Sequence, residues 1–570
     1  MTAFAYHETT KHHFNRFARS AGFLDWATQP DPFRRYAGAS LISLSREPLA
    51  ATVPYDSLYD GSAPVLPVDA GSISELLRCS MGLSAWKQYQ STRWALRVNP
   101  SSGNLHPTEA YIVWNGAVCH YAPREHALEQ RALLVGQGFS PGGWNGVGRV
   151  PLDPADQWLL VGLSSIFWRE AWKYGERAFR YCQHDLGHAQ AALRLSAARL
   201  GWQLHLLTTW SDADTATLLG LDRDEDFAEA EREAPECLLL VAPRGADVEA
   251  IGESARQLLA SARSSPWSGT ANRLSSTHVE WSIIEGVAHA TDYPGSIDLR
   301  VPALTVPTLV VPALLEPPVR VRADHDQPAA RAIMLQRRSA VAFDGRSSLP
   351  AATFKGMLAR LNPGHPPSDL LPWRPQVHLA LFVHRVDGLV PGIYAFIRDA
   401  AVRDEWQRVM RPQFLWEPMD EGSGLFLLLP FDMSWPATRV SCDQDIAGDG
   451  FFSLAMLAPL GTALRTYGQW FYRRLFWEAG LIGQVLYLEA EAAAARSTGI
   501  GCYYDDAVHE LLGLPLGPVE SADGTAGAAN WQSVYHFSMG IPVDDARLTT
   551  DPGYDWDVQG GPSASAEATA

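Results

Sequence analysis

The sequence has no long apolar run and few cysteines, and these absences exclude several classes of protein. No uninterrupted apolar stretch among its 570 residues approaches the ~18 to 20 residues that a membrane span needs. The first residues, MTAFAYHETTKHHFNRF, contain no apolar segment typical of an export signal. The six cysteines form no CxxC pair, which argues against a zinc knot or a disulfide framework. We therefore expect a cytoplasmic protein with no membrane partner.

Positive charge is also scarce. The formal net charge is -17, which opposes nonspecific nucleic-acid binding because phosphate backbones need a basic face. His7, His12 and His13 lack acidic or cysteine partners at ligand spacing, so we expect no metal site there. Neither nucleic acid nor metal is an expected partner.

An internal repeat is the most informative feature that is present. Residues 185–221 align without a gap on residues 478–514, with an offset of 293 residues. The alignment contains nine identities in 37 pairs, where composition alone would give about two or three. Gly187 is paired with Gly480, and the string LLGL occurs in both copies. The repeat predicts two related units of about 250 residues joined by connecting segments.

Composition along the chain suggests where these units begin and end. Aromatic, Pro and Gly residues without periodicity indicate an arm at the N-terminus. A stretch rich in Ala, Ser and Gly indicates a connection between the units. The closely spaced prolines of VPALTVPTLVVPALLEPP favour an extended crossing segment. The last residues have too little apolar surface to fold. The predicted layout is an arm at 1–70, unit 1 at 71–245, a linker and crossing segment at 246–328, unit 2 at 329–550 and a disordered tail at 551–570.

Two short segments have a composition suited to ligand binding. Residues 100–104, Pro-Ser-Ser-Gly-Asn, can bring backbone N–H groups and short donors against a planar, acceptor-rich ligand, although a plain turn is the alternative. Arg337, Arg338 and Ser339 suit a phosphate, because the guanidinium fork matches phosphate oxygens. A solvated basic patch is the alternative for this second segment.

These segments resemble the signatures of a known superfamily. PSSGNLHP, RRSAVAFD and the late GIGCYYDD before LLGL resemble three signatures of the FMN-dependent nitroreductase superfamily. PSSGNLHPTEAY, RAFRYCQHDLGHA and GIGCYYDDAVHELLGL are more specifically similar to the SagB-type dehydrogenase branch, which includes azoline oxidases. The resemblance covers most of 75–242 and 330–545. It implies an α+β fold in which two fused nitroreductase-like units, each a mostly antiparallel sheet packed by helices, form an intramolecular pseudo-dimer.

The resemblance also implies how FMN would be held. In the superfamily one subunit gives the Arg-x-Ser and late glycine segments, and its partner gives the Pro-Ser-Ser loop. The implied contacts are Arg337, Arg338, Ser339 and Arg547 for the phosphate, Pro100, Ser101, Ser102 and Asn104 for the ring and ribityl chain, and Gly501, Cys502, Tyr503 and Tyr504 for the N5 edge. Val341 replaces a cation found in many relatives, so Arg547 carries more of the phosphate contact in this interpretation.

The distribution of these motifs predicts one FMN site in each chain. A reciprocal site would need a Pro-Ser-Ser loop in unit 2, where LNPGHPPSDLLPWRPQ stands, and an Arg-Arg-Ser segment in unit 1, where SLSREPLAATVPY stands. Neither string contains the motif. A fused pair does not have to keep both equivalent sites.

Lys173 and Tyr174 are the candidate catalytic residues, because azoline oxidases carry a Lys-Tyr pair at the matching place. Oxidising an azoline removes a proton from carbon, so a positioned base is required. A surface lysine beside a core tyrosine is the alternative. Further along the same helix, Arg180 and Asp185 are expected to form a helix-internal polar network.

The predicted function is that of an FMN-dependent oxidoreductase. Dehydrogenation of an azoline-like or other small heterocycle, free or carried on a peptide, is the leading hypothesis. An NAD(P)H-dependent nitro or quinone reductase is one alternative, and a catalytically inert flavin-binding scaffold in a peptide-modifying complex is another. The fused chain can also associate further as a homo-oligomer.

Overall fold

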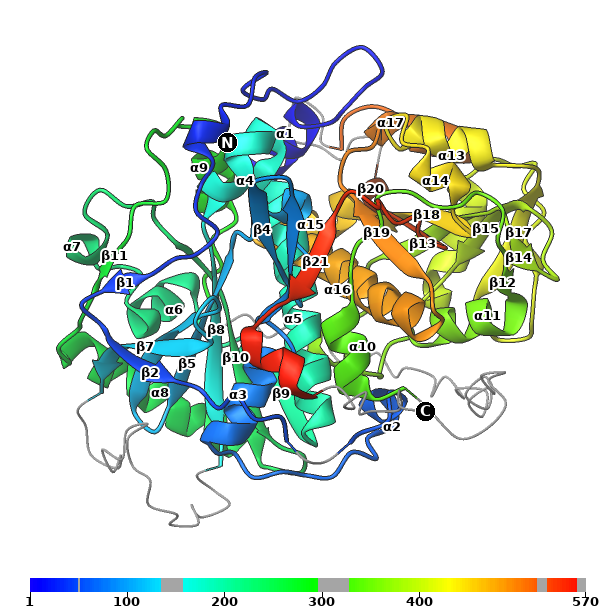
Figure 1. Cartoon of the computed structure of the whole chain (residues 1–570). Coiled ribbons are helices and arrows are strands. Elements are labelled where there is room, and N and C mark those ends of the chain that lie inside the picture. Colours follow the sequence, from blue (N-terminus) through cyan, green and yellow to red (C-terminus); the bar gives the residue numbers. More distant parts are fainter. Residues whose placement is uncertain (50–51, 135–156, 296–327, 520–529, 561–570) are drawn as a thin grey trace, which may run out of the picture.

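A computed structural model of the chain describes residues 1–49, 52–134, 157–295, 328–519 and 530–560, with side chains to 557 (Figure 1). The predicted crossing segment at 301–318 lies outside the described residues. Two sheets of seven strands dominate the described part, and every strand pairing within them is antiparallel. The predicted α+β fold with mostly antiparallel sheets is therefore confirmed.

The two sheets have corresponding strand orders. In spatial order the first is β2 (Ser40–Ser43), β7 (Ala127–Leu133), β6 (Ala117–Ala122), β5 (Thr108–Trp114), β8 (Leu159–Ser165), β10 (Ala234–Pro243) and β9 (Trp202–Leu206). The second is β16 (Glu417–Pro418), β17 (Leu425–Pro430), β15 (Gly392–Phe396), β13 (His378–Val383), β18 (Phe452–Ala458), β20 (Gln532–Gly540) and β19 (Arg496–Ile500). When β2 and β16 are left out, the six remaining strands of each sheet follow one another along the chain in the same spatial order, as expected for two related units.

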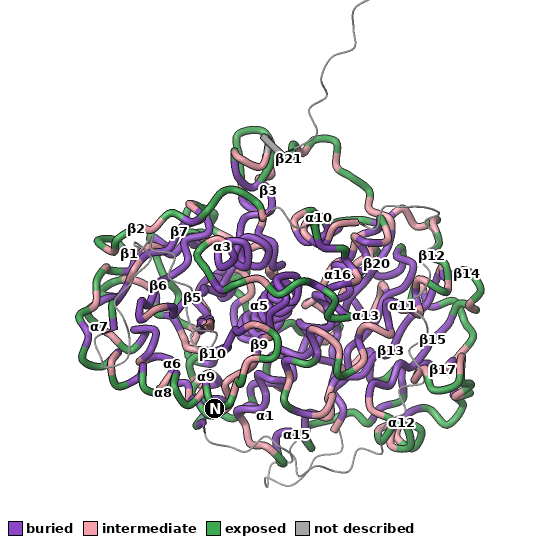
Figure 2. Tube along the Cα trace, turned by 90° about the horizontal axis from the view of Figure 1, so that it is seen from below, coloured by how far each residue is buried: buried purple, intermediate pink, exposed green. Residues whose placement is uncertain are grey.

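Both faces of each sheet are covered, which explains why the central strands are almost continuously apolar. Along β5, Ile112 faces the central core shared by both units, whereas Tyr111 and Val113 belong to a separate outer cluster. This division follows from the alternation of side chains along a strand. Figure 2 shows buried residues gathered around α5, α16 and the central strands.

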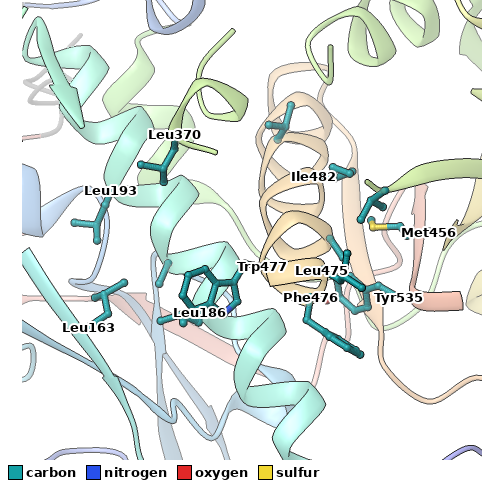
Figure 3. Packing of buried hydrophobic residues seen from close by; sticks show 14 of the residues in the cluster. Leu163, Leu186, Leu193, Leu370, Met456, Leu475, Phe476, Trp477, Ile482 and Tyr535 are labelled. Carbon is teal, nitrogen blue, oxygen red and sulfur yellow. The ribbon is translucent and has the colours of Figure 1, made fainter. Parts of the chain in front are cut away.

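Two long helices of equal length form the centre. Helix α5 (Ala178–Arg199) and helix α16 (Phe471–Ala492) begin and end 293 residues apart, as do α6 (Asp212–Leu219) and α17 (Asp505–Leu512). Figure 3 shows α5 and α16 side by side, with Trp477 of α16 lying next to Leu186 of α5. The structure thus reproduces the offset of the sequence repeat in whole elements and supports the interpretation of an internal duplication.

The aligned glycines lie where these two helices cross. A Cβ on Gly187 would stand 2.2 Å from the carbonyl oxygen of Trp477, and a Cβ on Gly480 would stand 2.2 Å from that of His184. Trp477 and His184 are themselves 293 residues apart, so each glycine faces the repeat-related backbone of the other helix. Backbones this close leave no room for a side chain, which accounts for glycine at both positions.

Two buried ion pairs join the units across this crossing. The Arg180 guanidinium on α5 donates to the Asp505 carboxylate on α17 at 2.8 Å, and Arg473 on α16 pairs with Asp212 on α6. Both members of the second pair stand 293 residues from their counterparts in the first. The expected helix-internal network of Arg180 with Asp185 is therefore wrong, because the interlocked units bring a closer carboxylate to Arg180.

Three connecting segments are more ordered than their composition suggested. In the arm, β2 extends the first sheet by pairing with β7. The expected linker contains α8 (Val248–Ser264), β11 (Thr270–Ala271) and α9 (Ser282–Ala290). The expected disordered tail is wrong for its first part, since β21 (Thr549–Pro552) pairs with β3 (Leu83–Tyr89) and Tyr554 is buried. Docking on another segment orders these residues, and composition does not report such docking.

The remaining elements complete the layers around the sheets. They are α1 (Ala3–Thr9), β1 (Tyr36–Ala37), α2 (Ser57–Asp60), α3 (Ala70–Arg78), β4 (Thr92–Arg97), α4 (Phe167–Tyr174), α7 (Asp224–Phe227), α10 (Ala330–Gln336), β12 (Leu349–Pro350), α11 (Ala351–Ala359), β14 (Val386–Asp387), α12 (Arg403–Val409), α13 (Ser434–Val440), α14 (Ile446–Asp449) and α15 (Leu460–Tyr467). Among the helices that the structure describes, none is both long and apolar enough to cross a membrane.

Candidate functional site

The Pro-Ser-Ser-Gly-Asn loop lies between β4 and β5 and is held by helix α5. The backbone N–H and the hydroxyl of Ser102 donate to the Asp185 carboxylate at 2.9 and 3.0 Å. The Asn104 side chain is used within the loop, donating to the Ala95 carbonyl at 2.9 Å and lying 3.0 Å from a ring nitrogen of His106. The loop is thus rigidly anchored, and its Asn104 amide is already engaged.

Helix α4 places Lys173 and Tyr174 directly on this loop. A Cβ on Gly103 would stand 2.6 Å from the Tyr174 hydroxyl oxygen and 3.2 Å from the Lys173 nitrogen. Gly103 also has a positive φ of 58°, so both its conformation and its surroundings favour glycine. The Lys173 and Tyr174 side chains are half-buried rather than fully solvated. The two candidate catalytic residues and the loop therefore form one surface.

The segment Gly501–Tyr504 of the second half reaches the same place. A Cβ on Gly501 would stand 2.1 Å from the ring of Tyr181, whose ring centre lies 4.5 Å from that of Tyr174. The Arg177 guanidinium donates to the Gly501 carbonyl at 3.2 Å. Segments separated by more than 300 residues in the sequence therefore meet around two tyrosines of the first half.

The side chains of this late segment face different neighbours. Tyr503 is buried, donates its hydroxyl to the Ser533 carbonyl at 3.0 Å and stacks on His536. The Tyr504 hydroxyl lies 3.3 Å from a carboxylate oxygen of Asp443. Neither side chain is placed at the loop, so any contact of these residues with a ligand there would come from the backbone.

Cys502 forms a pair with another cysteine of the second half. The hydrogen bond with Cys442, followed by the hydrogen bond with His12 and the positive charge of Arg177, lowers the pKa of Cys502 to about 5. The same hydrogen bond raises the pKa of Cys442. The Gln444 amide donates to the Cys502 carbonyl at 2.9 Å and fixes the two segments together. Cys502 is therefore expected to be a thiolate near neutral pH.

Arg337 is buried at the interface between the halves, where the negative charge of Glu491 acts on it. Its guanidinium donates to the carbonyls of Arg97 and Val98, each at 2.9 Å, just before the Pro-Ser-Ser loop. Burial lowers the pKa of Arg337, and burial together with Arg337 lowers the pKa of Arg338 to about 10. Within the described ranges, neither guanidinium makes an ion pair. The charge of Glu491 acts on both guanidiniums, of which Arg337 is buried and Arg338 half-buried, and an anionic group fits these two cations.

Of the two other residues expected at the phosphate, Ser339 is linked to the site and Arg547 is not. The Ser339 hydroxyl lies 2.9 Å from that of Tyr487, which accepts the Gly499 N–H at 3.0 Å, so Ser339 is linked to the late glycine strand. Arg547 instead is exposed and pairs with its neighbour Asp545 at 2.7 Å. The structure does not bring Arg547 together with Arg337.

Sequence reasoning missed several side chains in this region. The charge of Arg338 lowers the pKa of Lys87, and the charge of Arg496 lowers the pKa of Arg338. Tyr181 and Tyr487 lie where the segments meet. Glu170 lies one helical turn before Lys173, a spacing that places it on the same helix face. That spacing was the one signal in the sequence that pointed to Glu170.

The place related to this site by the repeat is filled with side chains. Glu478, the counterpart of Asp185, accepts hydrogen bonds from Arg398 at 2.5 Å and from the Trp373 indole at 3.2 Å. Arg474 stacks on Trp477 at 3.6 Å, beside a cavity of only about 10 Å³. Within the described part of the chain, no arginine pairs with Asp185, the carboxylate of the first place. The asymmetry that the motifs indicated is thus accompanied by an asymmetry in packing.

The residues present fit a flavin mononucleotide. The phosphate of this cofactor is an anion, for which Arg337 and Arg338 provide two guanidiniums that form no ion pair with the described residues. Gly103, Gly499 and Gly501 let the side chains of Tyr174, Tyr535 and Tyr181 approach the backbone closely, so tyrosines of both halves cover these three positions. When bound, the flavin supplies a hydride acceptor at N5.

Comparisons with known proteins support a nitroreductase-like fold. Residues 67–229 match the model of the Nitroreductase family. A candidate nitroreductase from Anabaena variabilis of known structure aligns with 95% of this chain and 99% of its own, with a TM-score of 0.62 and 22% identity. At this identity the likeness concerns the fold, and it extends over both seven-stranded sheets.

Other structures resemble a smaller part of the chain. One chain in the structure of the E. coli microcin synthetase McbBCD complex with truncated pro-MccB17 bound aligns over 86% of its own length with 42% of this chain. The identity is 18% and the TM-score is 0.23. Nitroreductase A from Vibrio parahaemolyticus aligns over 76% of its own length with 42% of this chain, with 12% identity and a TM-score of 0.22. No curated protein matches the sequence.

Proposed function

We propose that this protein is an FMN-dependent oxidoreductase with one composite flavin site per chain. The observation that carries the proposal is the meeting of three segments, the Pro-Ser-Ser loop, the Lys173-Tyr174 pair and the Gly501–Tyr504 backbone, beside two arginines without ion pairs. The match of residues 67–229 to the nitroreductase model supports the same chemistry.

Each group has a role that follows from its position. Arg337 and Arg338 bind the phosphate, assisted by Ser339. Ser101 and Ser102 present the backbone of an anchored loop to the ring, and Asp185 keeps that loop in place. Arg547, which is paired with Asp545, has at most a small share in phosphate binding.

The proposed reaction is dehydrogenation of an azoline-like heterocycle, free or carried on a peptide. Lys173 takes the substrate proton, and Tyr174, whose hydroxyl lies against Gly103, orients the heterocycle and limits access of water. The resemblance of the Lys-Tyr pair to azoline oxidases supports this choice. An NAD(P)H-dependent nitro or quinone reductase is the second candidate, favoured by the family model that matches the first half.

Flavin content tests the site. We expect one FMN per chain, measured by absorbance after denaturation, in the wild type and in Arg346→Ala, an exposed arginine of the same half. Arg337→Lys should retain the fold but lose most of the flavin, because lysine cannot reproduce the fork of hydrogen bonds. No flavin after reconstitution would overturn the proposal, and two per chain would overturn the single site.

Turnover distinguishes the two reactions. A synthetic thiazoline peptide should be oxidised with oxygen as the final acceptor, and Lys173→Ala should lower kcat by about 100-fold or more with flavin content unchanged. Stoichiometric NADPH oxidation with a quinone, unaffected by Lys173→Ala, would instead establish the reductase.

A further inference from the structure

The N-terminal arm carries a group of exposed aromatic side chains that the fold does not bury. Phe14, Phe17, Phe23 and Trp26 are 55%, 51%, 79% and 65% exposed. Single exposed apolar side chains are ordinary on a folded protein, but four aromatic rings in one short stretch form a larger apolar surface. Surfaces of this kind mark sites of interaction.

This stretch is fixed to both segments that form the candidate site. At its beginning, the His12 backbone N–H donates to the Asp505 carboxylate at 2.8 Å, and the Asp505 N–H donates to the His12 carbonyl at 3.1 Å. Further along, the Arg19 carbonyl accepts the Glu176 N–H at 2.9 Å, and the Arg19 guanidinium donates to the Glu176 carboxylate at 2.8 Å. Asp505 directly follows the Gly501–Tyr504 segment, and Glu176 closely follows the candidate catalytic pair. Figure 1 shows this blue stretch at the same end of the molecule as α4 and α17.

The exposed rings pack on aromatic side chains of those two segments. The ring centre of Phe14 lies 4.6 Å from that of Tyr504, and the ring centre of Phe17 lies 5.8 Å from it. Trp26 packs edge-on against Trp172, with the ring centres 5.4 Å apart, and Trp172 directly precedes the candidate catalytic pair. The exposed aromatic surface therefore borders the candidate site on two sides.

Helix α13 extends this surface on the side of the second half. The Arg439 guanidinium lies 5.1 Å from the ring centre of Phe14. Trp435, which is 71% exposed, stands four residues before Arg439 on α13, so the two side chains lie on the same face of the helix. The aromatic surface thus receives side chains from the arm and from the second half.

The charge of this stretch differs from that of the whole protein. Residues 10–24 contain Lys11, Arg16 and Arg19 and no acidic residue, whereas the formal charge of the chain is -17. Arg16 is exposed and forms no ion pair with the described residues. A ligand that complements this surface therefore has apolar side chains and a negative charge.

An extended peptide fits this surface better than a membrane does. Exposed aromatic rings beside arginines suit both, but anionic lipids repel a protein with a formal charge of -17. A heterocycle that is part of a peptide brings flanking side chains to the border of the site, where the exposed rings lie. A small free heterocycle has no groups that reach them.

We propose that this arm surface binds the apolar and acidic residues that flank the heterocycle of a peptide substrate. The arm surface consists of Phe14, Arg16, Phe17, Phe23, Trp26 and Trp435. The proposal rests on the proposed function in placing the heterocycle at Lys173. The rings lose water as the apolar side chains of the peptide cover them, and Arg16 pairs with a carboxylate of the peptide.

Peptide binding tests the arm surface without any reaction. The probe is a short fluorescent peptide in which leucine, phenylalanine and aspartate flank a thiazole, the oxidised ring, and anisotropy gives its Kd. Phe14→Ser and Trp26→Ser should each raise Kd about 10-fold, and because both rings are more than half exposed, the fold should be kept. Leu41→Ser is the matched control, since Leu41 is 50% exposed on β2, and it should leave Kd unchanged.

Two outcomes of the binding experiment would overturn the proposal. One is a wild type that binds the probe no better than the same peptide with serine in place of leucine and phenylalanine. The other is a Kd that neither Phe14→Ser nor Trp26→Ser changes. Vesicles of phosphatidylcholine and phosphatidylglycerol should not sediment the protein, and sedimentation that Trp26→Ser abolishes would assign the surface to a membrane instead.

Turnover separates this proposal from the proposed function. In the flavin-loaded wild type, kcat/KM should be about 10-fold or more higher for the thiazoline peptide than for free 2-methylthiazoline, and Trp26→Ser should remove most of this advantage by raising KM. Equal kcat/KM for the two substrates would overturn the arm surface and leave the proposed function intact. Protein that binds the probe through the arm surface but holds no flavin would retain the arm surface and refute the proposed function.

Discussion

Replacing Gly480 by alanine tests whether the close crossing of α5 and α16 holds the two halves together. The new Cβ would stand 2.2 Å from the His184 carbonyl oxygen and 3.0 Å from the Cα of Gly187, whereas real Cβ contacts essentially never fall below 3.0 Å. Both neighbours are backbone, so the helices themselves must move apart. Overpacking of a core typically costs ~1–3 kcal/mol, and we take the upper end because no flexible side chain can yield.

The helix propensity of alanine works in the opposite direction. It favours the substitution by ~1 kcal/mol, so the expected net loss of stability is about 2 kcal/mol, or roughly a 30-fold shift of the folding equilibrium. The assay is urea unfolding followed by tryptophan fluorescence. Gly187→Ala should behave similarly, because its Cβ would stand 2.2 Å from the Trp477 carbonyl oxygen.

A matched control is available in α8. A Cβ on Gly252 would have Leu207 at 4.0 Å as its nearest contact, so Gly252→Ala should stabilise the protein by up to ~1 kcal/mol. Gly480→Ala should also weaken flavin retention, since moving α5 moves Asp185 and the loop that it anchors. A Gly480→Ala protein as stable as Gly252→Ala, with normal flavin content, would refute the crossing argument.

Two further predictions concern pH. The iodoacetamide alkylation rate of Cys502 should reach its plateau within a unit or so above pH 5, because the pKa of its thiol is lowered to about 5. Cys442→Ser should move this pH profile to higher pH. A profile centred near 8.5, as for a free thiol, would contradict the hydrogen-bonded pair. Burial opposes the charge on His120, but hydrogen bonds to Glu109 and Glu129 raise the pKa of His120 to about 9. The charged imidazole therefore stabilises the fold fully below the pKa of ~6.5 that His120 has in the unfolded chain, and this stabilisation disappears as pH rises through about 9. His120→Asn should therefore lose stability relative to the wild type at pH 6 and converge with it above pH 9 in urea unfolding, whereas a pH-independent difference would exclude a charged His120.

The architecture of the units could be predicted from the sequence. The offset of 293 residues reappears in the bounds of α5 and α16, and the aligned Gly187 and Gly480 lie face to face at the crossing. Local periodicity records which residues of an element face the core, and a duplication preserves it in both copies. The sequence placed Lys173 and Arg180 on one helix, but the structure divides it at Gly175, whose Cβ would stand 2.3 Å from the Arg19 carbonyl oxygen.

The partners of individual polar groups could not be predicted, because they come from distant parts of the chain. Arg180 pairs with Asp505 rather than Asp185, and Arg398 fills the counterpart of the site. Glu170 belongs to no motif, and its complete burial exists only in the folded chain. The sequence alone determined the repeated elements and the candidate ligand segments, because both are recorded in local patterns. Tertiary structure alone decided which charges are paired, which arginines form no ion pair with the described residues, and which of the two repeat-related carboxylates receives an arginine, because these depend on contacts between residues far apart in the sequence.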